Sequence, residues 1–209
     1  MFNPNNLDEG KGMVVGDCND IPTEKRWKVE TPIFKEIIFK QMGNAKVIVD
    51  YGCGVGRLAR EIIDNNKDIE KVIGIDSSRK MLEVAKQYVL SERFIPVHTS
   101  EINSIKYKVD YLYCIYVLQH VPAIELREVI NDLATLSNRV FVVNSCVRMA
   151  VSGEGFVNDG IDILKELSRK FKTIRWGIPI RYIIDNEIMR TMFLDGNTKH
   201  YGVLCENEK

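Results

Sequence analysis

The chain has 209 residues, of which 45% are hydrophobic and 28% are charged. A chain of this size typically forms one ordinary domain and buries about 70% of the surface that it exposes when unfolded, so it can build a core without disulfides or metal ions. Its 29 basic residues balance its 29 acidic residues, which disfavours broad binding to nucleic-acid backbones or anionic membranes, since such proteins usually carry a basic excess.

The sequence also disfavours several locations and cofactors. No apolar run approaches the roughly 20 residues that span a bilayer, and residues 1–20 lack the apolar core of a signal peptide. The five cysteines are scattered and form no CxxC pair, which argues against a disulfide framework and against a zinc site. We therefore expect a cytoplasmic protein with no metal ion and no membrane partner.

The first 44 residues precede the repeating part of the sequence. Residues 1–20 have no periodicity and are rich in Gly, Asn and Asp, so we expect a loosely ordered arm, or one that orders over a ligand. Thr31 and Pro32 are typical of the cap and first turn of a helix, which then continues at helical spacing to Gly43. We expect residues 1–44 to cover the functional site and residues 45–209 to form the main domain.

From residue 45 onward, short apolar runs alternate with amphipathic stretches. The β-branched runs predict strands, and apolar stripes at helical spacing predict helices between them. Pro96 would break a central ladder, so its strand is expected at the periphery of the sheet. The predicted strands are 46–50, 71–75, 93–98, 109–115, 139–144 and 173–176, and the predicted helices are 57–66, 78–90, 122–136 and 161–170.

The C-terminal stretch has a different pattern. Two apolar runs, 189–194 and 201–205, flank an Asp195-Gly196 turn, which is typical of an antiparallel hairpin. Strands that alternate with helices form parallel sheets through right-handed crossovers. We therefore predict an α/β fold with a doubly wound, mostly parallel sheet and an antiparallel element at its C-terminal end.

The strongest chemical signal is VIVDYGCGVGRL at residues 47–58, where a buried strand ends in Asp50, three glycines follow at alternate positions, and a helix begins. Glycines let the backbone turn sharply and let a ligand lie against it, and the helix N-terminus offers free N–H groups and partial positive charge. Asp76 ends the next strand, 20 residues after Gly56, where an acid binds ribose hydroxyls in doubly wound folds. These two strand ends predict a site for an adenosine-containing ligand.

The details of the loop favour one ligand over another. A dinucleotide fingerprint places a third glycine where the pyrophosphate meets the helix, but that position is Arg57 when counted from Gly52 and Ala59 when counted from Gly54. Asp50 would repel a pyrophosphate and attract an ammonium or sulfonium group. The loop therefore favours a ligand with positive charge nearby, with an NAD(P)-dependent oxidoreductase as the alternative.

Three segments resemble a known family. DYGCGVG after one strand, GIDS after the next and VDYLYCIYVLQHVP at residues 109–122 are similar to motifs of the class I S-adenosylmethionine-dependent methyltransferases. The resemblance covers about residues 45–145. It implies a Rossmann-like, seven-stranded sheet with an antiparallel C-terminal strand in a three-layer αβα arrangement. It also implies S-adenosyl-L-methionine as the cofactor and S-adenosyl-L-homocysteine as the product.

The resemblance further implies roles for individual residues. Asp50 would lie near the methionine moiety and Asp76 would accept hydrogen bonds from both ribose hydroxyls. The family often has an acid after the third strand, but Thr99 stands there, so its neighbours or backbone groups would contact the adenine instead. The cofactor-binding residues implied in this way are Asp50, Gly52, Cys53, Gly54, Gly56, Asp76, Ser77, Met81, Ser100, Glu101 and Ile115.

Fewer signals define the catalytic side. His120 is the candidate general base, because an ordinary histidine titrates near pH 6.5, although it would equally suit the ordering of the loop that follows. Trp27 and Tyr116 are candidates for a substrate pocket, although aromatic residues more often pack in a core. Arg57 is expected to be a solvated residue in the first turn of its helix. Residues 145–160 contain three glycines and are expected to form a mobile flap.

The acceptor is predicted largely from absent motifs. Adenine-N6 methyltransferases commonly carry an N/D-P-P-Y/F segment after the fourth strand, where this chain has Cys114-Ile115-Tyr116-Val117, and the Pro-Cys pair of cytosine-C5 enzymes does not occur. We therefore expect in-line methyl transfer to an oxygen or nitrogen atom of a small molecule rather than to a nucleic acid. A protein acceptor stays open, as does a non-catalytic module that binds a nucleoside or a partner. The oligomeric state is not predicted.

Overall fold

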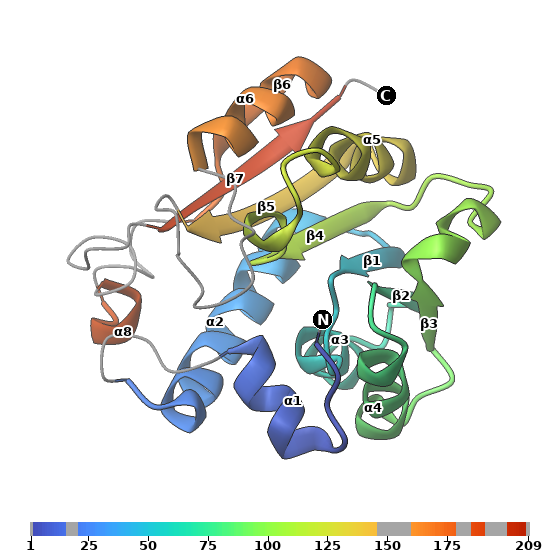
Figure 1. Ribbon diagram of the computed structural model, residues 1–209, viewed down its shortest axis with the longest axis vertical. Helices are drawn as coiled ribbons and strands as arrows, with labels where there is room; N and C mark the ends of the chain where they lie inside the picture. Colours follow the sequence, from blue (N-terminus) through green and yellow to red (C-terminus); the bar gives the residue numbers. More distant parts are fainter. Residues whose placement is uncertain (1, 16–20, 146–159, 179–184, 191–199, 208–209) are drawn as a thin grey trace. The chain divides into compact units, whose positions relative to one another are not determined.

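The fold is described from a computed structural model, over residues 2–15, 21–145, 160–178, 185–190 and 200–207 (Figure 1). The chain divides into two compact units, Met1–Asp110 and Tyr111–Lys209. Within the described residues, no helix combines the length and the apolar character that crossing a membrane requires.

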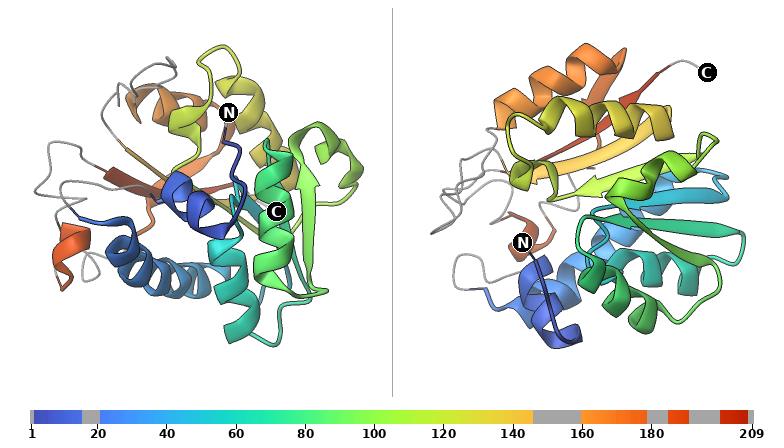
Figure 2. Two further views of the ribbon diagram at one scale, coloured as in Figure 1. Left: turned by 60° about the horizontal axis from the view of Figure 1, so that its bottom comes forward. Right: turned by 45° about the vertical axis from the view of Figure 1, so that its right-hand side comes forward.

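The first unit is built on three parallel strands in the order β3-β2-β1, with Val47 opposite Lys71 and Val72 opposite Phe94. Helices α3 and α4 lie side by side and pack against β2 (Figure 2). β1 and β2 are buried along almost their whole length, as parallel strands covered on both faces should be. The elements are α1 (Leu7–Val14), α2 (Thr23–Met42), β1 (Val47–Tyr51), α3 (Arg57–Asn65), β2 (Lys71–Asp76), α4 (Arg79–Val89), β3 (Phe94–His98) and the 3₁₀ helix η1 (Thr99–Ser104).

The second unit carries four strands in the order β4-β5-β7-β6. β4 and β5 are parallel, with Leu112 opposite Val140, whereas β7 runs antiparallel to both β5 and β6. Helices α5 and α6 pack against each other (Figure 2). The elements are β4 (Tyr111–Ile115), η2 (Leu118–His120), α5 (Leu126–Leu136), β5 (Arg139–Ser145), α6 (Gly160–Lys170), β6 (Thr173–Trp176), α8 (Glu187–Arg190) and β7 (His200–Glu206).

The strands confirm the predicted fold class. Seven strands lie within the described residues: β1 to β3 and the β4–β5 pair are parallel, and the last of the seven along the chain is antiparallel. The strand with Pro96 is at the edge of the sheet, as predicted, because β3 has a single neighbour among the strands that the structure describes. The other strands and helices predicted between residues 46 and 176 begin and end within a few residues of the predicted bounds, whereas η1, η2 and α8 were not predicted.

The N-terminal elements differ from the prediction. Residues 7–14 form a helix, α1, where a loosely ordered arm was expected. The side chain of Asn6 accepts a hydrogen bond from the N–H of Glu9 at 2.9 Å, and the carboxylate of Glu9 accepts one from the N–H of Asn5 at 2.9 Å. This arrangement resembles a capping box, except that Glu9 accepts from the residue before the cap, and its Asn-x-x-Glu spacing is visible in the sequence.

The prediction that Thr31 and Pro32 begin a helix is wrong. Helix α2 starts at Thr23, and Pro32 lies inside it. A proline within a helix removes one backbone hydrogen bond, while the hydroxyl of Thr31 donates to the carbonyl of Trp27, one turn earlier. Burial of residues on one face of α2, among them Trp27, Phe34 and Ile37, stabilises the helix across the proline.

The predicted C-terminal hairpin is also wrong. β7 pairs with β5 on one side and with β6 on the other, which leaves neither edge for a hairpin partner. Of the run 189–194, Met189 and Arg190 belong to α8, and residues 191–194 lie outside the described residues. β7 is buried along most of its length, so it gains more by lying between two strands than at the edge of a hairpin.

Candidate functional site

The glycine loop after β1 has a left-handed backbone at all three of its alternate glycines. The φ angle is +74° at Gly52, +53° at Gly54 and +78° at Gly56, where another residue would lose roughly 1–2 kcal/mol. The N–H groups of Gly52 and Cys53 donate to the carbonyl of Ile75 at 2.7 and 3.0 Å. The alternating glycines are thus required by the backbone, and the loop is tied to the end of β2.

Asp76 connects the end of β2 to the same loop. Its Oδ2 accepts a hydrogen bond from the N–H of Gly54 at 2.9 Å, and its Oδ1 accepts one from the N–H of Ser78 at 2.8 Å. A carboxylate offers about four lone-pair sites, so these two bonds leave capacity for further donors. Burial is the main influence on the pKa of Asp76 and raises it, while the two backbone donors lower it.

Asp50 and Cys53 lie on the buried side of this loop. Asp50 is 5% exposed and stands opposite Gly74 in the ladder between β1 and β2. Burial raises the pKa of the Cys53 thiol well above its ordinary value, and the nearby carboxylates of Asp50 and Asp76 raise it further. The thiol therefore stays protonated near neutral pH and is unsuited to act as a nucleophile.

The ends of β2 and β3 are joined by His98, which the sequence analysis did not single out. Its Nε2 lies 3.0 Å from the carbonyl of Ser77, and its Nδ1 lies 3.2 Å from the N–H of Ser100 and 2.7 Å from the Ser100 hydroxyl. Because a carbonyl only accepts, Nε2 carries the proton and Nδ1 accepts from Ser100. The imidazole thus links Ser77 and Ser100, two of the residues that are predicted to lie near the adenine.

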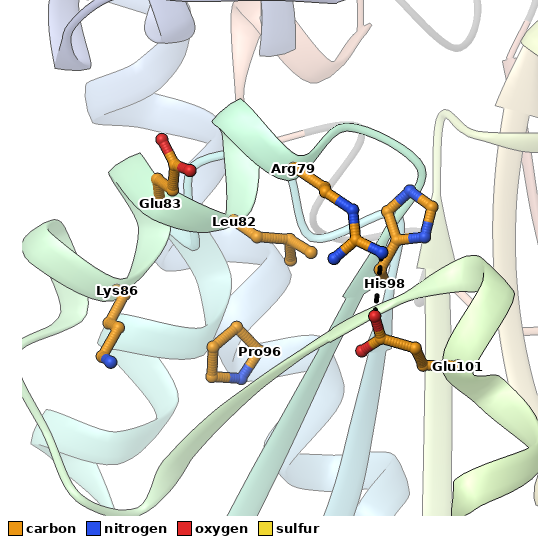
Figure 3. A pocket seen from close by; sticks show the side chains of 7 residues that line it. All are labelled: Arg79, Leu82, Glu83, Lys86, Pro96, His98 and Glu101. Atoms are coloured by element: carbon orange, nitrogen blue, oxygen red, sulfur yellow. Dashed lines mark hydrogen bonds and ion pairs between the residues drawn. The ribbon is translucent and has the colours of Figure 1, made fainter.

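Glu101 lies at the rim of a shallow groove between α4 and β3. Its carboxylate pairs with the guanidinium of Arg79 at 2.9 Å, and Figure 3 shows the two side chains pointing toward each other across the groove. Both side chains are more than half exposed, so their ion pair contributes little to stability. The lining residues are Arg79, Leu82, Glu83, Lys86, Pro96, His98 and Glu101.

Met81 and Trp27 lie in a buried apolar cluster that also contains Val15, Val55 and Val84. The ring of Trp27 is edge-on to that of Tyr88, with centroids 6.3 Å apart. The cluster joins the N-terminal arm, the glycine loop and α4. The contacts of Met81 with adenine and of Trp27 with a substrate stay predictions.

The prediction that Arg57 is solvated is wrong. Its side chain is 5% exposed, and Nη1 lies 3.6 Å from Oε2 of Glu30 on α2, which is fully buried. The other oxygen of Glu30 lies 2.6 Å from Nε of Arg26. The guanidinium of Arg57 also lies 5.4 Å from the centre of the Trp27 ring. The pairing of α2 with α3 brings these side chains together, and no local pattern around Arg57 shows it.

In the second unit, β4 ends at Ile115, and Tyr116 follows with a φ angle of +61°. The N–H of Tyr116 donates to the carbonyl of Val143 at 2.7 Å. A non-glycine residue in this region is strained, and such strain collects at functional sites. The ring of Tyr116 meets that of His200 edge-on, with centroids 5.3 Å apart. His200 was not among the predicted site residues.

His120 is the last residue of η2. Its Nε2 lies 3.1 Å from the side-chain nitrogen of Gln119, so with the amide nitrogen as donor Nε2 is the acceptor. Burial lowers the pKa of His120 below its ordinary value of 6.5. The imidazole is therefore uncharged near neutral pH, which is the form that can accept a proton.

Asn144 lies near the end of β5, opposite Tyr201 of β7. Its side chain is fully buried. Among the residues that the structure describes, neither the oxygen nor the nitrogen of its amide has a hydrogen-bond partner. A buried polar group that is left unpaired costs about 1–3 kcal/mol. The sequence analysis did not identify Asn144, whose place beside β7 depends on a pairing across more than fifty residues.

Two further expectations concern metals and the flap. Across residues 2–15, 21–145, 160–178, 185–190 and 200–207, no group of three or more His, Cys, Asp or Glu is placed to hold a metal ion. The expected flap at residues 145–160 lies outside the described residues, apart from the last residue of β5 and the first residue of α6.

Comparisons with known proteins agree with this geometry. Residues 48–138 match the model of a family described as methyltransferase domain. A comparison with curated proteins finds no match.

Among solved structures, the methyltransferase domain of bacterial CtHen1-C is similar, with a TM-score of 0.63 and 18% identity over 86% of this chain and 98% of that one. Magnesium protoporphyrin IX methyltransferase from Synechocystis, with bound SAH (S-adenosylhomocysteine), has a TM-score of 0.57 and 16% identity over 94% and 93%. An O-methyltransferase family protein from Burkholderia thailandensis has a TM-score of 0.64 and 12% identity over 89% of this chain and 58% of that one. At these identities the similarity shows the fold, and the chain spans less than two thirds of the Burkholderia protein.

The residues present fit S-adenosylmethionine. The left-handed loop gives a ligand close access to the backbone, and the carboxylate of Asp76 keeps acceptor capacity for ribose hydroxyls. The family model covers the loop, Asp76 and β4. Residues 48–138 thus carry a methyltransferase domain, in a fold that the chain shares with solved methyltransferases.

Proposed function

We propose that this methyltransferase acts on an oxygen or nitrogen atom of a small, polar molecule, in the cytoplasm. The observation that carries the choice of acceptor is Asn144, whose buried amide has no partner among the described residues. An acceptor that pairs with this amide must itself become buried, which suits a small molecule better than a folded protein or a nucleic acid. The zero net charge of the chain supports the same choice.

The cofactor is proposed to be held by the first unit. Asp76 accepts hydrogen bonds from the two ribose hydroxyls, beside those it already accepts from Gly54 and Ser78. Asp50 lies near the ammonium group of the methionine moiety, and the backbone from Gly52 to Gly54 lies against the ligand. The left-handed loop and the short bonds to Ile75 support this proposal, because they fix the loop before the ligand arrives.

The cofactor supplies a methyl group that its sulfonium already activates. The protein then has to hold the acceptor atom in line and to exclude water, and positioning of this kind can contribute about 7–11 kcal/mol to a reaction. Asn144 is proposed to orient the acceptor through its amide. His120 is proposed to take the proton from the acceptor, since burial keeps its imidazole uncharged.

The cofactor proposal is tested by isothermal titration with S-adenosylhomocysteine. We expect the wild type to bind in the micromolar range and Asp76→Ala to bind about a hundredfold more weakly, because two hydrogen bonds to a charged group are lost. Asp64→Ala is the control, since Asp64 is an exposed residue that pairs only with Arg60 among the described residues, and it should bind like the wild type. Binding of NAD(H) with none of S-adenosylhomocysteine would overturn the proposal.

The acceptor proposal is tested with a labelled methyl group. The purified protein and labelled S-adenosylmethionine are added to a cell extract, which is then separated by size and treated with nuclease or protease. We expect the label in the low-mass fraction before any digestion. Label that is released only by nuclease, or only by protease, contradicts a small-molecule acceptor.

A further inference from the structure

Helix α1 lies directly on the glycine loop. A Cβ atom added to Gly10 would lie 2.3 Å from Cγ1 of Val55, and one added to Gly54 would lie 2.6 Å from Cγ2 of Val14. Both distances are far below an ordinary contact between carbon atoms, which begins at about 3.5 Å. The helix and the loop therefore touch at two places, and at each place a glycine faces a valine of the other segment.

Two polar contacts attach α1 to α2. Nζ of Lys11 lies 3.1 Å from Oε1 of Glu24, and Nη1 of Arg26 donates to the carbonyl of Val15, the residue after α1. The contact of Lys11 is exposed, whereas that of Arg26 is buried. Figures 1 and 2 show α1 lying beside α2, and α1 also packs against α4.

One buried carboxylate connects this attachment to the loop. Glu30 is fully buried and lies 2.6 Å from Arg26 and 3.6 Å from Arg57. Arg26 holds the end of α1, and Arg57 is the first residue of α3, directly after the last glycine of the loop. Removing one member of a buried ionic group is strongly destabilising, so the group ties the position of α1 to that of the loop.

We propose that α1 is a wall of the cofactor site and that Gly10 and Arg26 are positioning residues for the cofactor. Gly10 lets α1 lie close on the loop, and Arg26 holds its C-terminal end. In this arrangement the adenosyl ligand leaves only when α1 lifts, so the two residues set how long the cofactor and its product stay bound. The inference rests on the proposal that this loop holds S-adenosylmethionine.

The chain offers a matched pair of variants. Gly10→Ala and Gly12→Ala both place an alanine in α1, where it favours the helix by about 1 kcal/mol. A Cβ at Gly12 meets nothing within 4 Å, whereas one at Gly10 collides with Val55. The two variants thus differ in whether α1 can lie on the loop and not in the helix propensity of the exchanged residue.

The measurement is the dissociation rate of S-adenosylhomocysteine by stopped-flow displacement. We expect Gly10→Ala to release the ligand at least about tenfold faster than the wild type, and Gly12→Ala to release it at the wild-type rate. Arg26→Gln should also accelerate release, whereas Arg127→Gln, which breaks an exposed pair with Glu166 in the second unit, should not. Thermal unfolding of each variant shows whether it is folded.

Hydrogen exchange provides a second readout. In the wild type, S-adenosylhomocysteine should slow exchange in residues 7–15, and in Gly10→Ala this protection should be lost. Two results would overturn the inference and leave the cofactor proposal intact. One is an equal release rate in the two glycine variants, and the other is a hydrogen-exchange rate in α1 that the ligand does not change. A wild-type chain that binds no S-adenosylhomocysteine overturns the cofactor proposal, and the inference with it.

Discussion

The two units differ in how their buried polar groups are satisfied. In the first unit the buried carboxylates have N–H or cationic partners: Asp76 accepts from Gly54 and Ser78, and Glu30 lies at ion-pair distance from Arg26 and Arg57, although its Oε2 accepts no hydrogen bond among the described residues. In the second unit, the amide of Asn144 has no partner among the described residues, and the backbone of Tyr116 is strained. A site for an unvarying cofactor can be complete before the ligand binds, whereas a site for a particular acceptor leaves groups for that acceptor to satisfy.

If this division holds, a change in the second unit should reduce turnover and leave cofactor binding unchanged. The largest effect is expected for His120→Gln, since a positioned general base contributes about 10²–10⁴ in rate. The affinity for S-adenosylhomocysteine should stay at its wild-type value. Titration calorimetry and initial rates measure the two quantities, and a large loss of affinity would break the division.

The pH profiles of the wild type and of His120→Gln test whether His120 is the general base. Because burial lowers the pKa of His120 below 6.5, the wild-type kcat/KM should fall only when the pH drops through this lowered value, as the imidazole becomes protonated. The His120→Gln variant should lack this acidic limb. An identical limb in both proteins would show that another group takes the proton.

Conversely, a change in the first unit should weaken the binding of the cofactor. Gly54→Ala and Gly43→Ala each force alanine to a positive φ angle, at +53° and +59°, where a residue other than glycine is strained. A Cβ at Gly54 also collides with Val14, whereas one at Gly43 meets nothing within 4 Å. We expect Gly54→Ala to weaken S-adenosylhomocysteine binding by at least about tenfold and Gly43→Ala to leave it unchanged. Equal affinities would remove the loop from the site.

Asn144→Leu tests the unpaired amide. Leucine has a similar size and no polar atoms, so thermal unfolding should occur at the same temperature or higher, because the cost of an unsatisfied amide disappears. At the same time kcat/KM should fall by about tenfold, as a hydrogen bond to the acceptor is lost. A destabilised variant with full activity would assign Asn144 to the structure instead.

The smallest effect concerns the pH dependence of cofactor binding. Burial raises the pKa of Asp76 above 3.8, so its protonated form contributes to stability below 3.8, and this contribution is lost as the pH rises through the folded-state value. Ribose hydroxyls donate to the ionised carboxylate. The affinity for S-adenosylhomocysteine should therefore fall as the pH drops through the raised pKa, by at most about tenfold per pH unit. Asp76→Asn should bind weakly with no such dependence.

The elements with strong local patterns could be predicted from the sequence. The alternation of β-branched runs and amphipathic stretches predicted the parallel sheet, and the motif around Asp50 and Asp76 predicted the residues at the ends of β1 and β2. Helix α1 was missed because Gly10 and Gly12 lower its helix propensity, although Asn6 caps it and Glu9 accepts from the N–H of Asn5. The start of α2 was missed because tertiary packing outweighs the proline signal.

The rest depends on contacts between distant segments. The burial of Arg57 comes from Glu30, which lies on α2. His200 and Asn144 are placed by the pairing of β7 with β5, a pairing that a local turn pattern at Asp195 and Gly196 obscured. The left-handed conformation of Tyr116 has no sequence signal, since tyrosine does not favour it. His200, Asn144 and Tyr116 lie in the second unit, which the proposal assigns to the acceptor, and that side was therefore the less predictable.

The edge strand β3 has a consequence for how the protein behaves at high concentration. An open strand edge is a template on which a second chain can add its own strand and begin aggregation. Pro96 removes one of the donors that such an added strand would need. The exposed charges of Arg79 and Glu101 stand beside the same strand. The proline that marked β3 as peripheral therefore also protects this edge against self-association.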